Sequence, residues 1–431
     1  MTPSRTLALV ACAALGCAVV AAPTASDPLT LQQAIAMAQE NNGTLRSAEL
    51  STSIATANVR RSFANFLPTV TPRYSYTTSR TETDGRTFGG SQDGSSAFVS
   101  ANWQLLDAGQ RMNNYAATRS SAESTRLLAV DRERSVLFTV HQQYFQALLQ
   151  QELVRNSEAQ VERANKILEQ TIFQVEIGQS AGKDVLQARA DALNAKVTLI
   201  EAQNSARNAV AALQATIGWP EGQPFPGLAT YAGSPNPDPI DDIDLTIRRA
   251  LDRRYDLRAA RQQVDADRYQ ARSQRIDAGL TWSLDATYQR QVEPTNSDFR
   301  QIGFFVSYPL FDGAQRRESA RIAQLQYEQR RAELSQQELN ARAEIEQVLN
   351  DYNLGEQQLE AAKLALEAAR LNYEAVIEGQ REGASDLIDV LTAQTTLVAA
   401  ENNYSRAVYS FYTTEVRMRL VTGEPLLGQR Q

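Results

Sequence analysis

The feature that most constrains this chain is an internal duplication. Shifted by 205 positions, residues 97–218 align with 302–423 without a gap, so that Asp107 falls on Asp312 and Gly178 on Gly383. Earlier in the chain the offset is 212, which places a loop seven residues longer in the first copy, between Tyr76 and position 97. Two copies that keep register over this distance predict one repeated architecture rather than two unrelated domains.

Prolines mark the limits of the two copies. Six of the 14 prolines lie between Pro220 and Pro239, in a stretch also rich in Gly, Asn and Asp, which indicates a linker. Positions 109–219 and 313–424 contain no proline, so both stretches are free to form helices. We expect a first structural repeat at 27–219, a linker at 220–242, a second repeat at 243–424 and a tail at 425–431.

Each copy also contains a pair of segments in which polar and apolar residues alternate, within 69–106 and within 281–311. Each segment has about nine to eleven residues, the length of a strand that crosses a bilayer. Four aromatic residues are then candidates for a belt in contact with lipid: Trp103, Trp282, Tyr288 and Tyr308. The polar segments 77–96 and 289–300 are expected to be exposed loops. This pattern alone also allows a soluble β-hairpin packed on a helical body.

Between the strands and the linker, each copy is expected to form a long helical hairpin. The outgoing helix of the first copy covers 109–177, about 104 Å as one helix. Positions 140, 147, 154, 161, 168 and 175 are all apolar, and this seven-residue period is typical of coiled coils. Glycine-containing turns at 178–182 and 379–383 permit a return helix, and an opening helix from Thr30 to Phe66 is expected to stack on its end.

Neither element completes a fold within one chain. A hairpin about 100 Å long needs lateral neighbours, and four strands are fewer than the roughly eight that close a barrel. A symmetric oligomer meets both needs, since three chains supply 12 strands and a ring of helices. The expected fold class is therefore mainly α with a membrane β-barrel, built as a homotrimer.

The N-terminal residues 1–22 have the pattern of an export signal, with Arg5 before an apolar stretch and small residues near Ala22. Residues 9–12 also fit a lipobox that would acylate Cys12, and Cys17 is a weaker candidate for the same modification. An uncleaved membrane anchor is the remaining alternative.

Composition narrows the function. The net charge of −7 argues against binding to nucleic acid. With one histidine, His141, and two cysteines, the mature chain lacks the residues for a His/Cys metal cluster or a Cys–His nucleophile, and no phosphate-binding loop is present. We expect no enzymatic activity, no metal and no cofactor, and we expect His141 to be solvated or to lie between helices.

Three sets of motifs together resemble the TolC family of outer-membrane efflux and secretion channels. They are Leu29–Ala38 followed by Asn41 and Asn42; Leu105–Arg111 with its copy Leu310–Arg316; and Gly178-x-Ser180 with Gly383-x-Ser385. The resemblance implies a 12-stranded barrel in the outer membrane of a Gram-negative-type bacterium, continued by a helical tunnel into the periplasm. It further implies a periplasmic adaptor protein and an inner-membrane transporter as partners.

The resemblance also assigns roles to the two helical tips, which close the periplasmic mouth and receive the adaptor. Asp184 and Asp389 correspond to the acidic residues at the mouth, although an acidic residue in a first helical turn can simply favour the helix dipole. Ser385 and Thr392 replace an arginine and an acidic residue of the family pattern, which puts the closing ion pairs in doubt. The expected docking residues at the tips are Gly178, Ser180, Gly182, Lys183, Gly383 and Asp386.

The rival interpretation is a periplasmic structural coiled-coil or adaptor protein without a barrel. It shares the export signal and the long helices. The alternating strand pair, present at the same place in both copies, distinguishes the channel from it.

Overall fold

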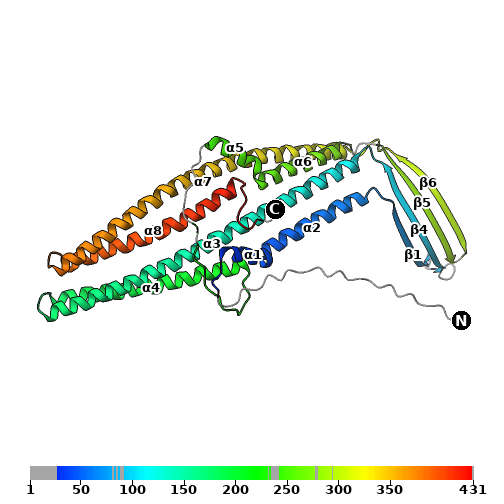
Figure 1. Ribbon diagram of the computed structural model, residues 1–431. Coiled ribbons are helices and arrows are strands. Elements are labelled where there is room, and N and C mark those ends of the chain that lie inside the picture. The colour runs from blue at the N-terminus through cyan, green and yellow to red at the C-terminus, as the bar shows by residue number, and fades with distance from the viewer. Residues whose placement is uncertain are drawn as a thin grey trace, which may run out of the picture.

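The computed structural model describes residues 27–429 except 80–81, 84–85, 88–91, 232, 234–241, 277–279 and 294. The predicted export signal with Cys12 and Cys17 lies outside the described residues, as does part of the predicted linker. The molecule is elongated, with a β-sheet at one end, long helices along its length and two helical tips at the other end (Figure 1).

Each copy is built from two opening helices, a strand pair and a long helical hairpin. The first copy comprises α1 (Leu31–Asn41), α2 (Gly43–Ala64), β1 (Thr69–Ser79), β2 (Glu82–Thr83), β3 (Arg86–Thr87), β4 (Gln92–Leu106), α3 (Gln110–Glu176) and α4 (Gly182–Ile217). The second comprises α5 (Ile243–Arg253), α6 (Tyr255–Ile276), β5 (Thr281–Glu293), β6 (Ser297–Ser307), α7 (Gln315–Arg381) and α8 (Leu387–Val421). The two outgoing helices, α3 and α7, have 67 residues each, so the duplication is kept in length as well as in motif.

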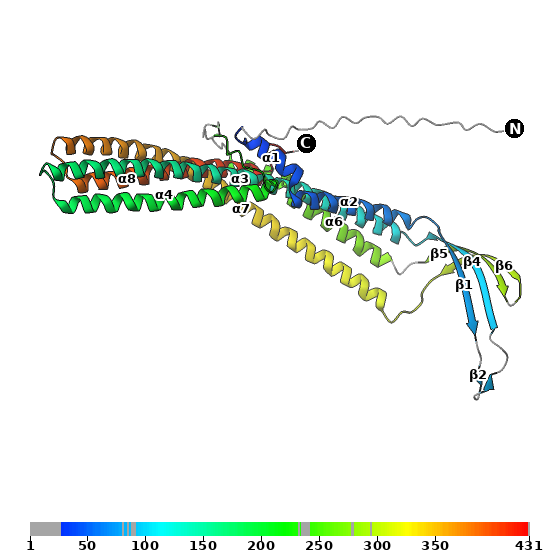
Figure 2. The same ribbon diagram turned by 90° about the horizontal axis from the view of Figure 1, so that it is seen from below.

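The helices pack in a row whose members change midway along the molecule. Near the sheet, α3 packs between α2 and α6, and α7 packs on α6. Towards the tips, α3 packs between α4 and α8, and α7 packs on α8. Figure 2 shows the two hairpins side by side at the tip end and the sheet beyond the other end. Within the described parts of the chain, no helix is both long and apolar enough to span a membrane.

The opening helix is interrupted, contrary to the prediction of one helix from Thr30 to Phe66. Asn42 ends α1 and caps α2, because its side-chain oxygen accepts hydrogen bonds from Thr44 N and Leu45 N at 2.9 and 3.3 Å. Its side-chain nitrogen donates to Thr216 O, at the end of α4, at 2.8 Å. The predicted stacking of the opening helix on the return helix is therefore confirmed, with Asn42 as the joint.

The largest buried cluster lies at this joint, midway along the molecule. Tyr144 and Phe145 of α3 are almost fully buried there, against residues of α1, α4 and α8. His141 lies one turn away, only 3% exposed, with Nδ1 2.7 Å from Leu137 O. It is interhelical rather than solvated, and burial lowers its pKa.

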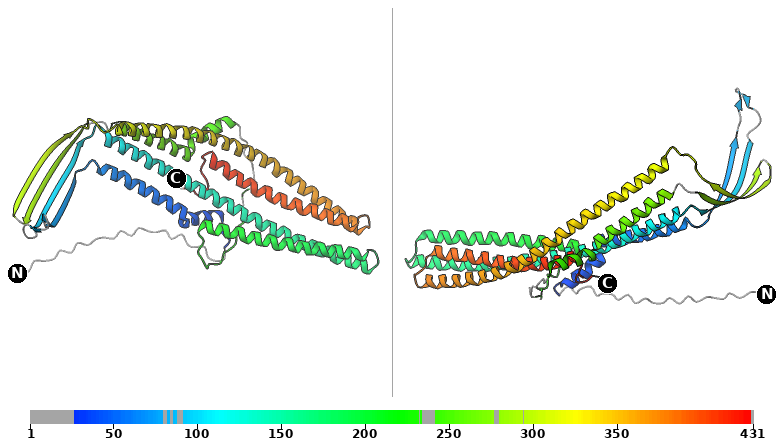
Figure 3. Two further views of the ribbon diagram at one scale, coloured as in Figure 1. Left: turned by 180° about the vertical axis from the view of Figure 1, so that it is seen from behind. Right: turned by 90° about the horizontal axis from the view of Figure 1, so that it is seen from above.

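The sheet has the strand order β1-β4-β5-β6, with all neighbours antiparallel. The predicted loop 289–300 is wrong, since β5 continues to Glu293 and β6 begins at Ser297. Likewise β2 and β3 form a small ladder within the predicted loop 77–96, in line with the β1–β4 hairpin (Figure 3). The two β-hairpins therefore extend further from the helices than the alternation of polar and apolar residues predicted.

Candidate functional site at the sheet and the helical tips

The sheet has one apolar face and one polar face. The register pairs Val99 with Pro72 on one side and with Tyr288 on the other, and Trp103 with Leu284, so these side chains share a face. The opposite face carries mainly serine, threonine, asparagine and glutamine, which pair across the strands in the same register. A sheet with these two faces can separate lipid from water.

The predicted aromatic belt falls on the apolar face. Trp103 and Trp282 lie at the helix end of the sheet, where Trp103 Nε1 donates to Phe66 O at 3.0 Å and the Trp282 ring meets the Phe304 ring edge-on. Tyr288 lies about 20 Å further along β5, and the Arg300 guanidinium stacks over its ring. Tyr308 follows the end of β6 and is exposed. Aromatic residues thus stand near both limits of an apolar band.

The first tip is a tight turn between α3 and α4. Gly178 has a φ of +78°, which favours glycine, and lets Gln179 N and Ser180 N turn back onto Gln174 O. Asp184 Oδ2 accepts hydrogen bonds from Ser180 Oγ at 2.8 Å and from Ala181 N at 3.2 Å. The Asp184 carboxylate therefore caps its own helix. Gly182 and Lys183, in the first turn of α4, are exposed.

The second tip has the same frame with different side chains. Gly383 has a φ of +80°, and Asp386 caps α8 by accepting from Asp389 N at 2.9 Å, while Asp389 Oδ2 accepts from Asp386 N at 3.1 Å. The side chain of Ser385 lies against Gly379. A Cβ atom added at Gly379 would be 2.6 Å from Ser385 Oγ, so a side chain at this position would require the Ser385 hydroxyl to move.

The tip carboxylates form hydrogen bonds only within their own hairpins. Thr392 lies one turn beyond Asp389, exposed, and donates to Ile388 O at 2.7 Å. The structure thus brings Asp184 together with Ser180, and Asp389 with Asp386, but it shows no contact between the two tip carboxylates of one chain.

Sequence reasoning missed an ion pair that joins the two hairpins. Arg163 of α3 donates two hydrogen bonds to Glu401 of α8, at 2.8 and 3.3 Å, and both side chains are about four-fifths buried. Nearby, Asn156 Nδ2 donates to Asn402 Oδ1 at 3.1 Å. Since the partners are 238 residues apart, only the helical periodicity of each hairpin could have suggested that these polar groups face each other.

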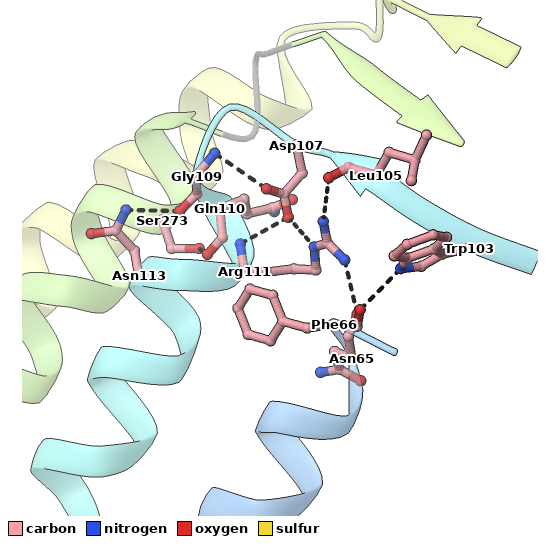
Figure 4. Close-up of polar contacts among 10 residues, drawn as sticks. All are labelled: Asn65, Phe66, Trp103, Leu105, Asp107, Gly109, Gln110, Arg111, Asn113 and Ser273. Carbon is pink, nitrogen blue, oxygen red and sulfur yellow. Dashed lines mark hydrogen bonds and ion pairs between the residues drawn. The ribbon is translucent and has the colours of Figure 1, made fainter. Parts of the chain in front are cut away.

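A second polar network joins the sheet to helices α2 and α3 (Figure 4). Asp107 is buried and accepts from Arg111 Nε at 2.7 Å, from Arg111 N at 2.9 Å and from Gly109 N at 3.2 Å. The Arg111 guanidinium also donates to Asn65 O and Leu105 O and lies over the Phe66 ring. The Leu105–Arg111 motif, one of those on which the resemblance rests, therefore holds the end of β4, the start of α3 and the end of α2 together.

The second copy repeats this network in a more exposed form. Arg316 Nε donates to Asp312 at 2.6 Å and its guanidinium donates to Pro309 O at 2.7 Å. The hydrogen bond from Arg316 lowers the pKa of Asp312. Both junctions contain an alanine in the left-handed region, Ala108 with a φ of +54° and Ala314 with a φ of +70°.

Comparisons with known proteins agree with this geometry. The family model described as "Outer membrane efflux protein" matches residues 34–219 and 246–424. Outer membrane efflux protein BepC of Brucella suis biovar 1 is 24% identical over 98% of this chain and 91% of BepC. Outer membrane protein TolC of Salmonella enteritidis is 23% identical over 93% of this chain and 83% of TolC. The solved structure of CusC has a TM-score of 0.81 and 19% identity, over 92% of each chain, and shows the same fold.

The fold and the two-faced sheet define an outer-membrane channel protein. The chain belongs to the outer membrane efflux protein family. The predicted fold class, the resemblance to the TolC family and the function as an outer-membrane efflux or secretion channel are confirmed, and the rival interpretation as a periplasmic coiled-coil or adaptor protein is not supported. The family is one of channels rather than of enzymes.

Proposed function

We propose that three copies of this chain form one conduit, with 12 strands in the outer membrane and the helices in the periplasm. The sheet is the observation that carries the proposal. Its outer strands, β1 and β6, each pair on one side only within the described residues, and its two faces differ in polarity. Pairing β6 of one copy with β1 of the next removes these open edges and turns the polar face towards a common lumen.

Two exposed apolar stripes support the same assembly. On α4 the stripe consists of Leu186, Ala190, Leu193, Val197 and Ile200. On α7 it consists of Ala361, Leu364, Ala368, Leu371 and Ala375. Both stripes have the alternating three- and four-residue spacing of a coiled-coil seam. Because α4 and α7 are the outer helices of the row at the tip end, the stripes meet when copies stand side by side.

The tips are proposed to receive a periplasmic adaptor protein, which connects the conduit to an inner-membrane transporter. The docking residues are Gly178, Ser180, Gly182, Lys183, Gly383 and Asp386. They are supported by their place on the two turns, which protrude furthest from the sheet (Figure 1). The channel conducts substrates passively, and the transporter supplies the energy.

Asp184 and Asp389 are proposed to ring the periplasmic mouth, three copies of each. Like charges that converge in a narrow mouth attract cations and repel one another. Ser385 and Thr392 are uncharged, which leaves the carboxylates without a basic partner at those places. The mouth is therefore expected to prefer cations.

The domain division is part of the same proposal. Residues 1–22 direct export and are removed, the repeats at 27–219 and 243–424 are joined by the linker 220–242, and residues 425–431 form the tail. Mass spectrometry of the mature N-terminus tests the first point. A lipid on Cys12 or Cys17 would replace simple cleavage by lipoprotein processing.

Native mass spectrometry of the detergent-solubilised protein, followed by conductance measurements in planar bilayers, tests the assembly and the mouth. A trimer with a cation-preferring conductance is expected, whereas a monomer without conductance would overturn the assembly. Asp184→Asn and Asp389→Asn keep a side-chain acceptor for the capping hydrogen bonds but remove the charge. These variants should lose cation preference, and an unchanged preference would leave both residues with the capping role alone.

A further inference from the structure

One row of side chains crosses the polar face of the sheet from edge to edge. Arg73 of β1 pairs with Phe98 of β4, Phe98 pairs with Gln289 of β5, and Gln289 pairs with Phe299 of β6. Directly paired residues on neighbouring antiparallel strands point to the same face. These four residues, called here the aromatic row, therefore stand side by side.

The aromatic row differs from the rows on either side of it. The next row towards the loops consists of Ser75, Ser96, Gln291 and Ser297, and the next row towards the helices consists of Thr71, Ser100, Thr287 and Gln301. The hydroxyl groups of Ser75 and Ser96 lie 2.8 Å apart, which confirms that they share a face. Since the neighbouring rows carry mostly short side chains, the aromatic row protrudes furthest from this part of the polar face.

The rings of the aromatic row are not buried in a core. Phe299 is 53% exposed, and Phe98 lies beneath the guanidinium of Arg73, 5.6 Å from the ring centroid. An exposed phenylalanine is expected on the lipid face of a membrane strand, but these two lie on the opposite face. Phenyl rings next to a cation on a water-facing surface form a binding surface for a flat, negatively charged solute.

We propose that the aromatic row is a substrate-contact site in the lumen, selective for amphipathic solutes that combine an aromatic ring with a carboxylate or sulfonate group. The inference rests on the proposed trimer, in which three copies of the row form a ring of three arginines and six phenylalanines. The solute ring stacks on Phe98 or Phe299, and its acidic group pairs with Arg73.

The placement of charges on the polar face of the sheet supports this choice of ligand. Asp285 lies two rows nearer the helices, about 13 Å along the strand from the aromatic row, and Asn102 Nδ2 donates to its carboxylate. Arg73 is thus separated from this carboxylate, so its guanidinium can pair with a solute instead. In the proposed conduit, an acidic aromatic compound that has passed Asp285 therefore meets a complementary charge at Arg73, nearer the outer end of the sheet.

Block of single-channel current in planar bilayers tests the proposal, with 1-naphthalenesulfonate as the probe and 1-butanesulfonate as the aliphatic probe of equal charge. The wild-type trimer should be blocked by the aromatic probe at a lower concentration than by the aliphatic one. Arg73→Gln should raise the half-blocking concentration of the aromatic probe about tenfold, as expected when one charge-assisted hydrogen bond is lost. Arg73→Lys should restore most of the block.

The two rings require a separate pair of variants. The double variant Phe98→Leu/Phe299→Leu should abolish the preference for the aromatic probe, whereas Phe304→Leu, on the opposite face, should keep it. If the wild-type protein forms no conducting trimer, the proposed assembly fails. If the trimer conducts but blocks equally with both probes, or if the row variants block as the wild type does, the aromatic row is not a contact site and the assembly stands.

Discussion

The guanidinium of Arg163 on α3 holds the carboxylate of Glu401 on α8 through two hydrogen bonds. It lies 15 positions before Gly178, about 22 Å above the first tip. The pair fastens one hairpin of the chain to the other where the tips themselves are joined by no ion pair between the described residues. In the proposed conduit, any opening of the mouth that separates the two hairpins has to break this pair.

Glu401→Gln should therefore make the mouth easier to open. Loss of a charge-assisted pair of this kind costs about 1.5 kcal/mol in each protomer, which is about a tenfold change in that protomer's ratio of closed to separated hairpins. Single-channel recording should show a larger open fraction than in the wild type. The exchanged pair Arg163→Glu/Glu401→Arg should return the open fraction towards the wild-type value. If neither variant behaves in this way, the pair between Arg163 and Glu401 does not hold the mouth closed.

The two sheet-to-helix junctions should respond unequally to loss of their aspartates. Asp107→Ala leaves the partly buried Arg111 without its carboxylate and should lower the free energy of unfolding by about 3 kcal/mol. Asp312→Ala should cost less, because the Asp312–Arg316 pair is more exposed. Thermal dissociation of the purified protein in detergent measures the order, and an equal loss in both variants would contradict it.

Replacing the strained alanines at these junctions should stabilise the protein. Ala108 and Ala314 adopt a left-handed backbone, which costs an L-residue about 1–2 kcal/mol and glycine almost nothing. Ala108→Gly and Ala314→Gly should each gain about 0.5–1 kcal/mol after the greater flexibility of the unfolded chain is counted.

The neighbouring glycines provide the matched controls for that prediction. Gly109 and Gly313 also have positive φ, and a Cβ atom at either would meet nothing within 4 Å. Gly109→Ala and Gly313→Ala should thus destabilise through the backbone alone. The same midpoint of thermal unfolding reports both directions, and a gain from the glycine-to-alanine changes would refute the argument from strain.

His141 should make the protein less stable as the pH falls. Burial lowers its pKa below the unfolded value of 6.5, so on acidification the unfolded chain takes up a proton before the folded one does. The contribution of neutral His141 to the free energy of unfolding is therefore fully present above pH 6.5. It decreases below that pH until the pKa of the folded state is reached. His141→Gln should flatten this part of the curve of melting temperature against pH. Because the chain has one histidine, a slope unchanged in His141→Gln would assign it to carboxylates.

The sequence alone predicted the helical hairpins and the strand pairs, because period and the absence of proline are local properties. It did not predict the break at Asn42, whose cap competes with an otherwise continuous helical pattern. The sequence also predicted β-hairpins that are too short. The last residues of β5, Gln289–Glu293, place polar residues on both faces, so the alternation that indicates a strand disappears there. Alternation marks only the strand segments that separate lipid from water.

The candidate sites were predicted as positions rather than as contacts. Asp184 and Asp389 were found from their place after the tip glycines, but their capping partners depend on turn geometry. Arg163 was missed because nothing near it in sequence marks Glu401 as its partner. The Leu105–Arg111 motif was recognised, yet its role required the position of the α2 end, which only the fold supplies.

The equal length of α3 and α7 also restricts how this protein can evolve. Deletion of one residue from either helix would turn everything beyond it by about 100° and draw it back by about 1.5 Å. The exposed apolar stripes, the Arg163–Glu401 ion pair and the tips would then no longer face their partners. The two halves of the gene are accordingly free to drift in residue identity but not in helix length. Insertions can accumulate in the outer hairpin, where the first copy already has seven residues more than the second.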